Sequence, residues 1–267
     1  MKRLALQSLA AAALLGAAVA ANAGIVRINE GAFTAQAGKI TFSEQPTGTN
    51  NPVYAPADYG GGAGAPTVSF GGFFSGQSLS ATPGADCPLG AASGCVVGTP
   101  SAGLSLDPNS PKTIISSDGS NPTSPVLSGS PLFNGPIAIL FSVDLAGVGL
   151  DGGFFNAIGG TAITAFDRNG NTLGQVKNAS CGNEYGNPPP CTAGGGIEFL
   201  GLVTDDGSEK IAGLLFSLVG AEPAGFAIDN VRFGRAGEVV NPNPEPASLA
   251  LVGLALAGLG LARRRRA

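Results

Sequence analysis

Apolar and polar residues alternate most clearly in the second half of the chain, and this alternation predicts β-strands. From Ile137 to Leu145, apolar side chains recur at every second position, which is the period of a strand with one buried face. The runs Ala162–Asp167 and Thr172–Val176 have the same character and flank Asn169-Gly170. Asn-Gly between two such runs is a strong hairpin signal, so we predict an antiparallel pair there.

Two further runs, Ile197–Thr204 and Lys210–Leu218, flank Asp205-Asp206-Gly207 and predict a second hairpin. A last strand is expected from Gly225 to Phe233. Five antiparallel strands in sequence, with earlier strands completing a second sheet, indicate a β-sandwich.

The last predicted strand changes the parity of its apolar positions. Phe226 and Ile228 share one face of a flat strand, whereas Val231 and Phe233 fall on the opposite face. One extra residue at Asp229-Asn230 brings both pairs to a common face, so we predict a β-bulge there. Bulges often re-aim side chains near functional sites, and this bulge would re-aim a carboxylate.

The first third of the chain carries weaker signals. Short strands are expected at Ile40–Phe42, Val68–Phe70 and Gly103–Leu106, separated by loops rich in Gly and Pro. The chain contains 43 Gly and 20 Pro residues, which favours turns and short strands over helices. We therefore expect an all-β fold, a single β-sandwich of jelly-roll type at residues 24–240 with long Gly/Pro-rich loops. These loops are either plain connections or a rim that binds a ligand.

An apolar run near the start of the chain predicts a targeting segment. Lys2 and Arg3 precede this run, and Ala21-Asn22-Ala23 has the small-x-small form of a signal-peptidase site, with Ala21 and Ala23 as the small residues. We predict a signal peptide at residues 1–23, signal peptidase as a transient partner, and Gly24 as the first mature residue. The alternative is a retained N-terminal anchor.

A second apolar run of sixteen residues, Ala247–Ala262, precedes the four arginines Arg263, Arg264, Arg265 and Arg266. As a helix it would be about 24 Å long, slightly shorter than a hydrocarbon core of about 30 Å. The long arginine side chains can extend to the headgroups, and clustered positive charge prefers the cytoplasmic side. We therefore predict a transmembrane helix with the body of the protein outside the inner membrane. The alternative is a buried core helix.

The triplet Pro244, Glu245 and Pro246 stands directly before this run. The triplet, the short apolar segment and the arginine cluster together resemble the PEP-CTERM sorting signal, which we place at residues 241–267. Asn243 departs from the family pattern, which often has Val at that position. The resemblance implies cleavage near the triplet by an exosortase, a membrane-embedded cysteine transpeptidase. It also implies transient anchoring in the inner membrane, followed by a location at the cell surface or in the extracellular matrix.

Between the two targeting segments the chain is acidic. Eight Lys and Arg stand against seventeen Asp and Glu from Gly24 to Asn243, which gives a net charge of −9. Nucleic acid is therefore not an expected partner, because its binding relies on basic surface. The four cysteines fall in two close pairs, and in an exported protein these predict the disulfides Cys87–Cys95 and Cys181–Cys191. Four thiolates on a metal ion are the alternative.

The segment from Phe226 to Phe233 also resembles the closing strand of many PEP-CTERM proteins and of carbohydrate-binding jelly rolls. In some of those modules, an Asp of the closing strand and an acid on the first strand share a structural calcium ion. The corresponding pair in this chain is Asp229 and Glu44. Calcium takes about six to eight oxygen ligands, so backbone carbonyls would have to complete the site. The alternative is that Asp229 only caps a turn.

The chain contains no histidine, which excludes Ser-His-Asp, Cys-His and histidine-ligated zinc chemistry. We therefore expect no enzymatic activity. The first hypothesis is a non-enzymatic surface or matrix protein that associates with exopolysaccharide in a biofilm, as the family resemblance implies. The second is a secreted carbohydrate-active enzyme that uses a pair of acids. The absence of tryptophan leaves Tyr54, Tyr59, Tyr185 and the phenylalanines as candidates for sugar stacking.

Overall fold

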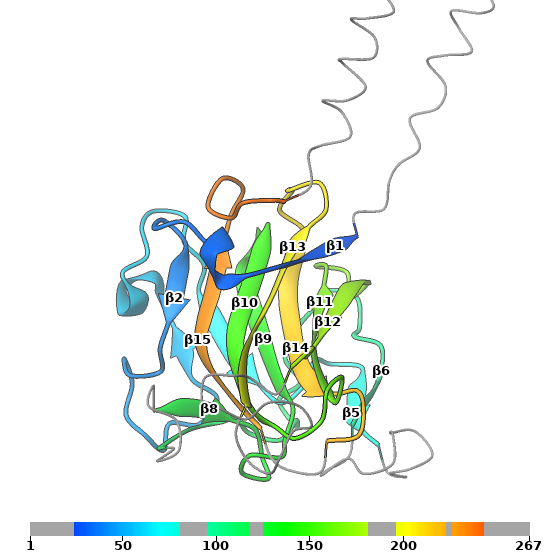
Figure 1. Cartoon of the computed structure of the whole chain (residues 1–267). Helices are drawn as coiled ribbons and strands as arrows, with labels where there is room; N and C mark the ends of the chain where they lie inside the picture. The colour runs from blue at the N-terminus through cyan, green and yellow to red at the C-terminus, as the bar shows by residue number, and fades with distance from the viewer. Residues whose placement is uncertain (1–23, 81–94, 118–124, 181–195, 223–225, 243–267) are drawn as a thin grey trace, which may run out of the picture.

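The computed structural model describes residues 24–80, 95–117, 125–180, 196–222 and 226–242. These residues form two antiparallel β-sheets that pack face to face, with a separate hairpin beside them (Figure 1). The predicted all-β fold is confirmed, whereas the jelly-roll connectivity stays a prediction. Within the described ranges no helix is long and apolar enough to cross a membrane. The predicted signal peptide and transmembrane helix lie outside these ranges.

The first sheet is built around three long strands in its centre and has short strands at its margins. Its order is β1 (Ile25–Ile28), β13 (Gly196–Thr204), β10 (Gly147–Phe155), β15 (Ala227–Gly234), β8 (Val126–Ser128) and β7 (Ile114–Ser116). Strand β2 (Gly38–Ile40) pairs antiparallel with residues Val231–Phe233 of β15.

The second sheet has the order β12 (Thr172–Lys177), β11 (Thr161–Phe166), β14 (Ile211–Leu218), β9 (Ile137–Leu145), β4 (Val68–Gly71) and β3 (Val53–Tyr54). The separate hairpin consists of β5 (Gln77–Leu79) and β6 (Val96–Gly98). Two single-turn 3-10 helices, η1 (Glu30–Ala32) and η2 (Pro56–Tyr59), lie in the connections of the N-terminal part.

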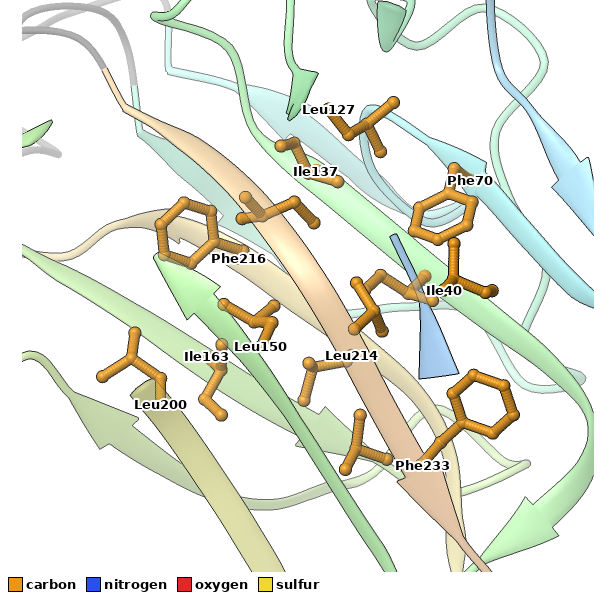
Figure 2. Packing of buried hydrophobic residues seen from close by; sticks show 14 of the residues in the cluster. Ile40, Phe70, Leu127, Ile137, Leu150, Ile163, Leu200, Leu214, Phe216 and Phe233 are labelled. Carbon is orange, nitrogen blue, oxygen red and sulfur yellow. The ribbon is translucent and has the colours of Figure 1, made fainter. Parts of the chain in front are cut away.

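The hydrophobic core lies between the two sheets. Figure 2 shows Leu150, Leu200 and Phe233 of the first sheet beside Ile163 and Phe216 of the second. All five side chains are at most 1% exposed. Full burial of such side chains contributes about 1.5–3 kcal/mol each, so this layer is the main source of stability.

Strand β10 lies in the centre of the first sheet and was not predicted from the sequence. It follows β9 after the single residue Ala146, so the chain changes sheets at this corner. Val148 and Leu150 point into the core, and glycines alternate with them on the outer face. A Cβ at Gly149 would come within 2.3 Å of the ring of Phe199, so the neighbouring strand occupies the space where β10 lacks side chains.

The two predicted hairpins have opposite outcomes. Strands β11 and β12 pair antiparallel around Asn169-Gly170, as predicted. The predicted hairpin around Asp205-Asp206-Gly207 is wrong, because β13 pairs with β1 and β10 whereas β14 pairs with β11 and β9. The connection at residues 205–210 crosses from one sheet to the other. Every residue of β14 is buried, so this strand needs a neighbour on each edge and a cover on each face.

The predicted bulge is confirmed. Gly149 of β10 pairs with Arg232, and Asp151 pairs with Asp229, so β15 has one more residue than β10 between these pairs. Asn230 adopts a left-handed backbone conformation with φ +47° at this point. As a result Phe226, Ile228, Val231 and Phe233 all join the core.

Predictions for the first third are partly corrected. Val68–Phe70 lies within β4 as expected, but the strand predicted at Ile40–Phe42 is Gly38–Ile40 instead. Phe42 leaves the strand with φ +59° and turns its ring into the core beside Phe70. The strand predicted at Gly103–Leu106 is absent among the described residues, where Leu106 forms only an isolated bridge to Phe74.

Candidate functional site

Most residues of the predicted sorting and processing sites lie outside the described ranges. These are Ala21 and Ala23, the triplet Pro244, Glu245 and Pro246, and the arginines Arg263–Arg266. Among the cysteines, Cys95 belongs to the described part; it is 6% exposed and disulfide-bonded. Cys87, Cys181 and Cys191 lie outside it, so the predicted pairing stays a prediction.

The two ends of the described chain meet at one connection. The backbone amide of Asp205 donates to the carbonyl of Gly24 at 3.0 Å. The side-chain amide of Asn241 donates to the carbonyl of Asp205 at 2.8 Å and to that of Thr204 at 3.3 Å. The first and last residues of the described chain therefore lie at the same end of the sandwich (Figure 1).

A buried polar cluster occupies the bulge of β15. Asp229 is 1% exposed, and its Oδ1 accepts the backbone amide of Asn230 at 2.6 Å. The side-chain amide of Asn230 donates to Oδ2 of Asp151 at 2.8 Å. Sequence reasoning missed Asp151 because it lies in the glycine-rich strand β10, although the register places it directly opposite Asp229.

Glu44, the predicted calcium partner of Asp229, is held by its own turn. Its Oε1 accepts the backbone amide of Thr41 at 2.9 Å and the hydroxyl of the same residue at 2.8 Å. No group of three or more His, Cys, Asp or Glu residues in the described part of the chain is arranged to hold a metal ion. The calcium site at Glu44 and Asp229 therefore stays a prediction, and these carboxylates serve as local hydrogen-bond acceptors.

A groove with a volume of about 520 Å³ runs beside the loop Gly60–Ala65. Two of the polar side chains that line it, Tyr59 and Arg235, have protein partners. Tyr59 donates its hydroxyl to the carbonyl of Pro66, and Arg235 forms a two-point ion pair with Glu209 at 3.0 and 3.1 Å. Burial, followed by the nearby charge of Glu238, raises the pKa of Tyr59 to about 12. This groove mixes charges, because Lys39, Arg235 and Glu238 all line it.

A second depression, which we call the sheet-face groove, lies on the outer face of the second sheet. Its volume is about 260 Å³, and its floor comes from three adjacent strands while the β5–β6 hairpin and the residues after it form one wall. The floor is fixed by register, because Leu215, Thr164 and Gln175 stand side by side across β14, β11 and β12. Ser217 lies in the next row.

The polar groups of the sheet-face groove are uncharged. They are contributed by Gln77, Thr99, Thr164, Thr172, Gln175 and Ser217, and none of the described residues that line the groove is charged. Gln175 donates from Nε2 to Oγ1 of Thr164 at 2.9 Å. Among the described residues, the hydroxyls of Thr172 and Ser217 have no protein partner. The exposed side chains of Thr172 and Gln175 therefore offer a hydroxyl and an amide to a ligand, whereas Ser217 is only 5% exposed.

Sequence reasoning missed these groove residues and proposed aromatic ones instead. Tyr54 is fully buried in the core between Phe42 and Phe70, and Tyr59 packs edge-on against Phe233 at 5.2 Å. Tyr185 lies outside the described ranges. The only signal for Thr164 and Gln175 was their outward position in the predicted hairpin, which most surface strand residues share.

Comparison with known protein families identifies one segment of the chain, residues 244–266. Residues 244–266 match the family model described as the PEP-CTERM protein-sorting motif. No curated protein and no solved structure matches the chain. The motif implies export, a membrane-associated sorting signal and processing by an exosortase. The chain therefore carries a PEP-CTERM protein-sorting motif at residues 244–266, which implies an exosortase-sorted surface protein, and its described residues form a β-sandwich.

Proposed function

We propose that the β-sandwich associates non-enzymatically with uncharged extracellular polysaccharide, through the sheet-face groove, after the protein has been sorted to the cell surface or the biofilm matrix. The observation that carries this proposal is the uncharged, hydrogen-bonding floor formed by Thr164, Gln175 and Ser217. Neutral sugars present hydroxyl groups, and amide and hydroxyl side chains can both donate to and accept from them.

The distribution of charge favours a neutral glycan over an acidic one. The described part of the chain between Gly24 and Pro242 contains all eight Lys and Arg of the region between the targeting segments. Five of these eight form ion pairs with Asp or Glu, namely Arg27, Arg168, Lys210, Arg232 and Arg235. Paired basic residues in an acidic domain provide little attraction for a polyanion.

The size and position of the groove suit a polymer. At about 260 Å³ it is smaller than the pockets of about 300–1,000 Å³ that enclose drug-sized ligands. A shallow site of this kind contacts one or two sugar units and leaves the rest of a chain free to extend. Many such contacts along one polysaccharide would raise the overall affinity by multivalency.

The experiment is retention of the exported protein on purified neutral and acidic polysaccharides, combined with an assay for new reducing ends. We expect retention by neutral polysaccharide without release of reducing ends. Release of reducing ends would favour the alternative, a secreted carbohydrate-active enzyme with an acid pair. Absence of retention by any polysaccharide would leave a plain structural role.

A further inference from the structure

Gly24 and Pro242, the two ends of the described chain, lie at one end of the sandwich. We call the surface at this end the terminal pole. It consists of Gly24, residues 205–210 and residues 235–242. Hydrogen bonds hold these three segments together, because Gly24 and Asn241 both bind Asp205. The amide of Val240 also donates to the carbonyl of Ala32 at 2.8 Å, so the chain is anchored to the sandwich up to Asn241.

The sorting motif begins very close to this anchor. The match starts at Pro244, and Glu245 is only four residues after Asn241. An extended chain spans at most about 3.3–3.6 Å per residue, so Glu245 lies no farther than about 14 Å from Asn241. An enzyme that cleaves near the triplet must therefore bring its catalytic residues within that distance of the terminal pole.

This reach is too short to keep the sandwich away from the enzyme. A domain of 100 residues has a radius of gyration of about 13 Å. Catalytic groups inside an enzyme of that size or larger therefore lie about as far below its surface as Glu245 can extend from Asn241. We propose that the terminal pole is a docking surface for the sorting enzyme, and that the enzyme recognises the folded body in addition to the triplet.

The charge of the pole indicates what kind of surface it meets. The pole contains four acids, Asp205, Asp206, Glu209 and Glu238, and two basic side chains, Lys210 and Arg235. Cleavage of the predicted signal peptide adds the positive amino group of Gly24, which leaves a net charge of −1. Lys210 pairs with Asp206 at 2.7 Å and Arg235 pairs with Glu209, so the negative charge outside these two ion pairs is carried by Glu238 and by Asp205, which lies beside Gly24. A basic extracytoplasmic surface of the enzyme complements this pole, whereas anionic lipid headgroups repel it.

The test measures the processed fraction of the full chain in cells that contain the sorting enzyme, by mass spectrometry of the exported protein. The double variant Asp205→Asn with Glu238→Gln removes two negative charges from the pole and keeps an acceptor oxygen at each position. Glu44→Gln with Asp107→Asn makes the same change in net charge outside the pole. We expect the processed fraction to fall at least threefold in the pole variant and to stay unchanged in the control.

A second variant separates docking from folding defects. Ten Gly and Ser residues inserted between Pro242 and Asn243 leave the sandwich untouched and free the triplet from the pole. Docking predicts slower processing of this insertion variant, because the pole no longer helps to position the triplet. Processing at the original rate in both the insertion and the pole variant would overturn the proposal. Cosedimentation of the purified protein with anionic lipid vesicles through this pole would also overturn it, because the partner would then be the bilayer.

Discussion

The ring of Phe233 occupies the space in which a side chain at position 38 would lie. A Cβ on Gly38 would come within 2.2 Å of Cε2 of Phe233, closer than any real contact. Gly38 belongs to β2, which pairs with the end of β15 and covers this part of the core. A glycine is therefore required for β2 to close over Phe233.

The substitution Gly38→Ala is expected to destabilise the sandwich by about 1–3 kcal/mol, because overpacking forces β2 or Phe233 to move. Gly62→Ala is the matched control, since a Cβ there would have no heavy atom within 4 Å. The control should be neutral or slightly stabilising. Urea unfolding of both variants measures the difference, and equal stability would contradict the packing of β2 over Phe233.

Asn230 supports the bulge both through its backbone and through its side chain. Asn230→Gly keeps the left-handed conformation and loses only the hydrogen bond to Asp151, at a cost of about 0.5–1.5 kcal/mol. Asn230→Val adds backbone strain for a β-branched residue, of order 1–3 kcal/mol. Thermal unfolding should therefore rank wild type above Gly and Gly above Val. A Val variant as stable as the Gly variant would exclude a strained bulge at this position.

Acid is expected to weaken the connection at residues 205–210. Burial opposes the ionisation of Asp206, but hydrogen bonds from Lys210 and Ser208 outweigh it and lower its pKa to about 2. Because the pKa is lower in the folded protein, the stabilisation is complete above the unfolded value of about 4 and is lost as the pH falls toward 2. The Asp206 side chain is 41% exposed, so solvent screening keeps the effect below about 1 kcal/mol.

The check is the urea midpoint at pH 7, 4 and 2 for wild type and Asp206→Asn. The variant should lose less stability between pH 4 and pH 2 than the wild type. Identical pH dependence of the two proteins would show that the ion pair with Lys210 contributes nothing. Lys210→Met, which removes the other partner, should change the pH dependence in the same direction.

Features that depend on neighbouring residues could be predicted from the sequence. The β11–β12 hairpin follows from Asn169-Gly170, and the bulge follows from the parity of four apolar residues between Phe226 and Phe233. The terminal sorting motif is recognised for the same reason, because order and spacing lie within one short segment.

Features that depend on distant partners could not be predicted. The turn at Asp205-Asp206-Gly207 leads from β13 in the first sheet to β14 in the second sheet. We attribute this sheet change to the burial of every residue of β14, which a hairpin signal in the turn does not reveal. Strand β10 was missed because it is rich in glycine, and at Gly149 the space of a side chain is taken by the ring of Phe199 on β13. The sheet-face groove was missed because Thr164, Gln175 and Ser217 come from three different strands. The sequence of a single strand does not show how the three strands are aligned.

The most direct test of the proposed function compares two glutamine variants for retention on neutral polysaccharide. Gln175→Ala removes an exposed amide from the sheet-face groove, whereas Gln36→Ala removes an exposed amide outside it. Loss of one hydrogen bond, worth about 0.5–1.5 kcal/mol, predicts a Kd about 2–10-fold weaker for Gln175→Ala and unchanged for Gln36→Ala. Equal retention of wild type and both variants would contradict binding through the sheet-face groove.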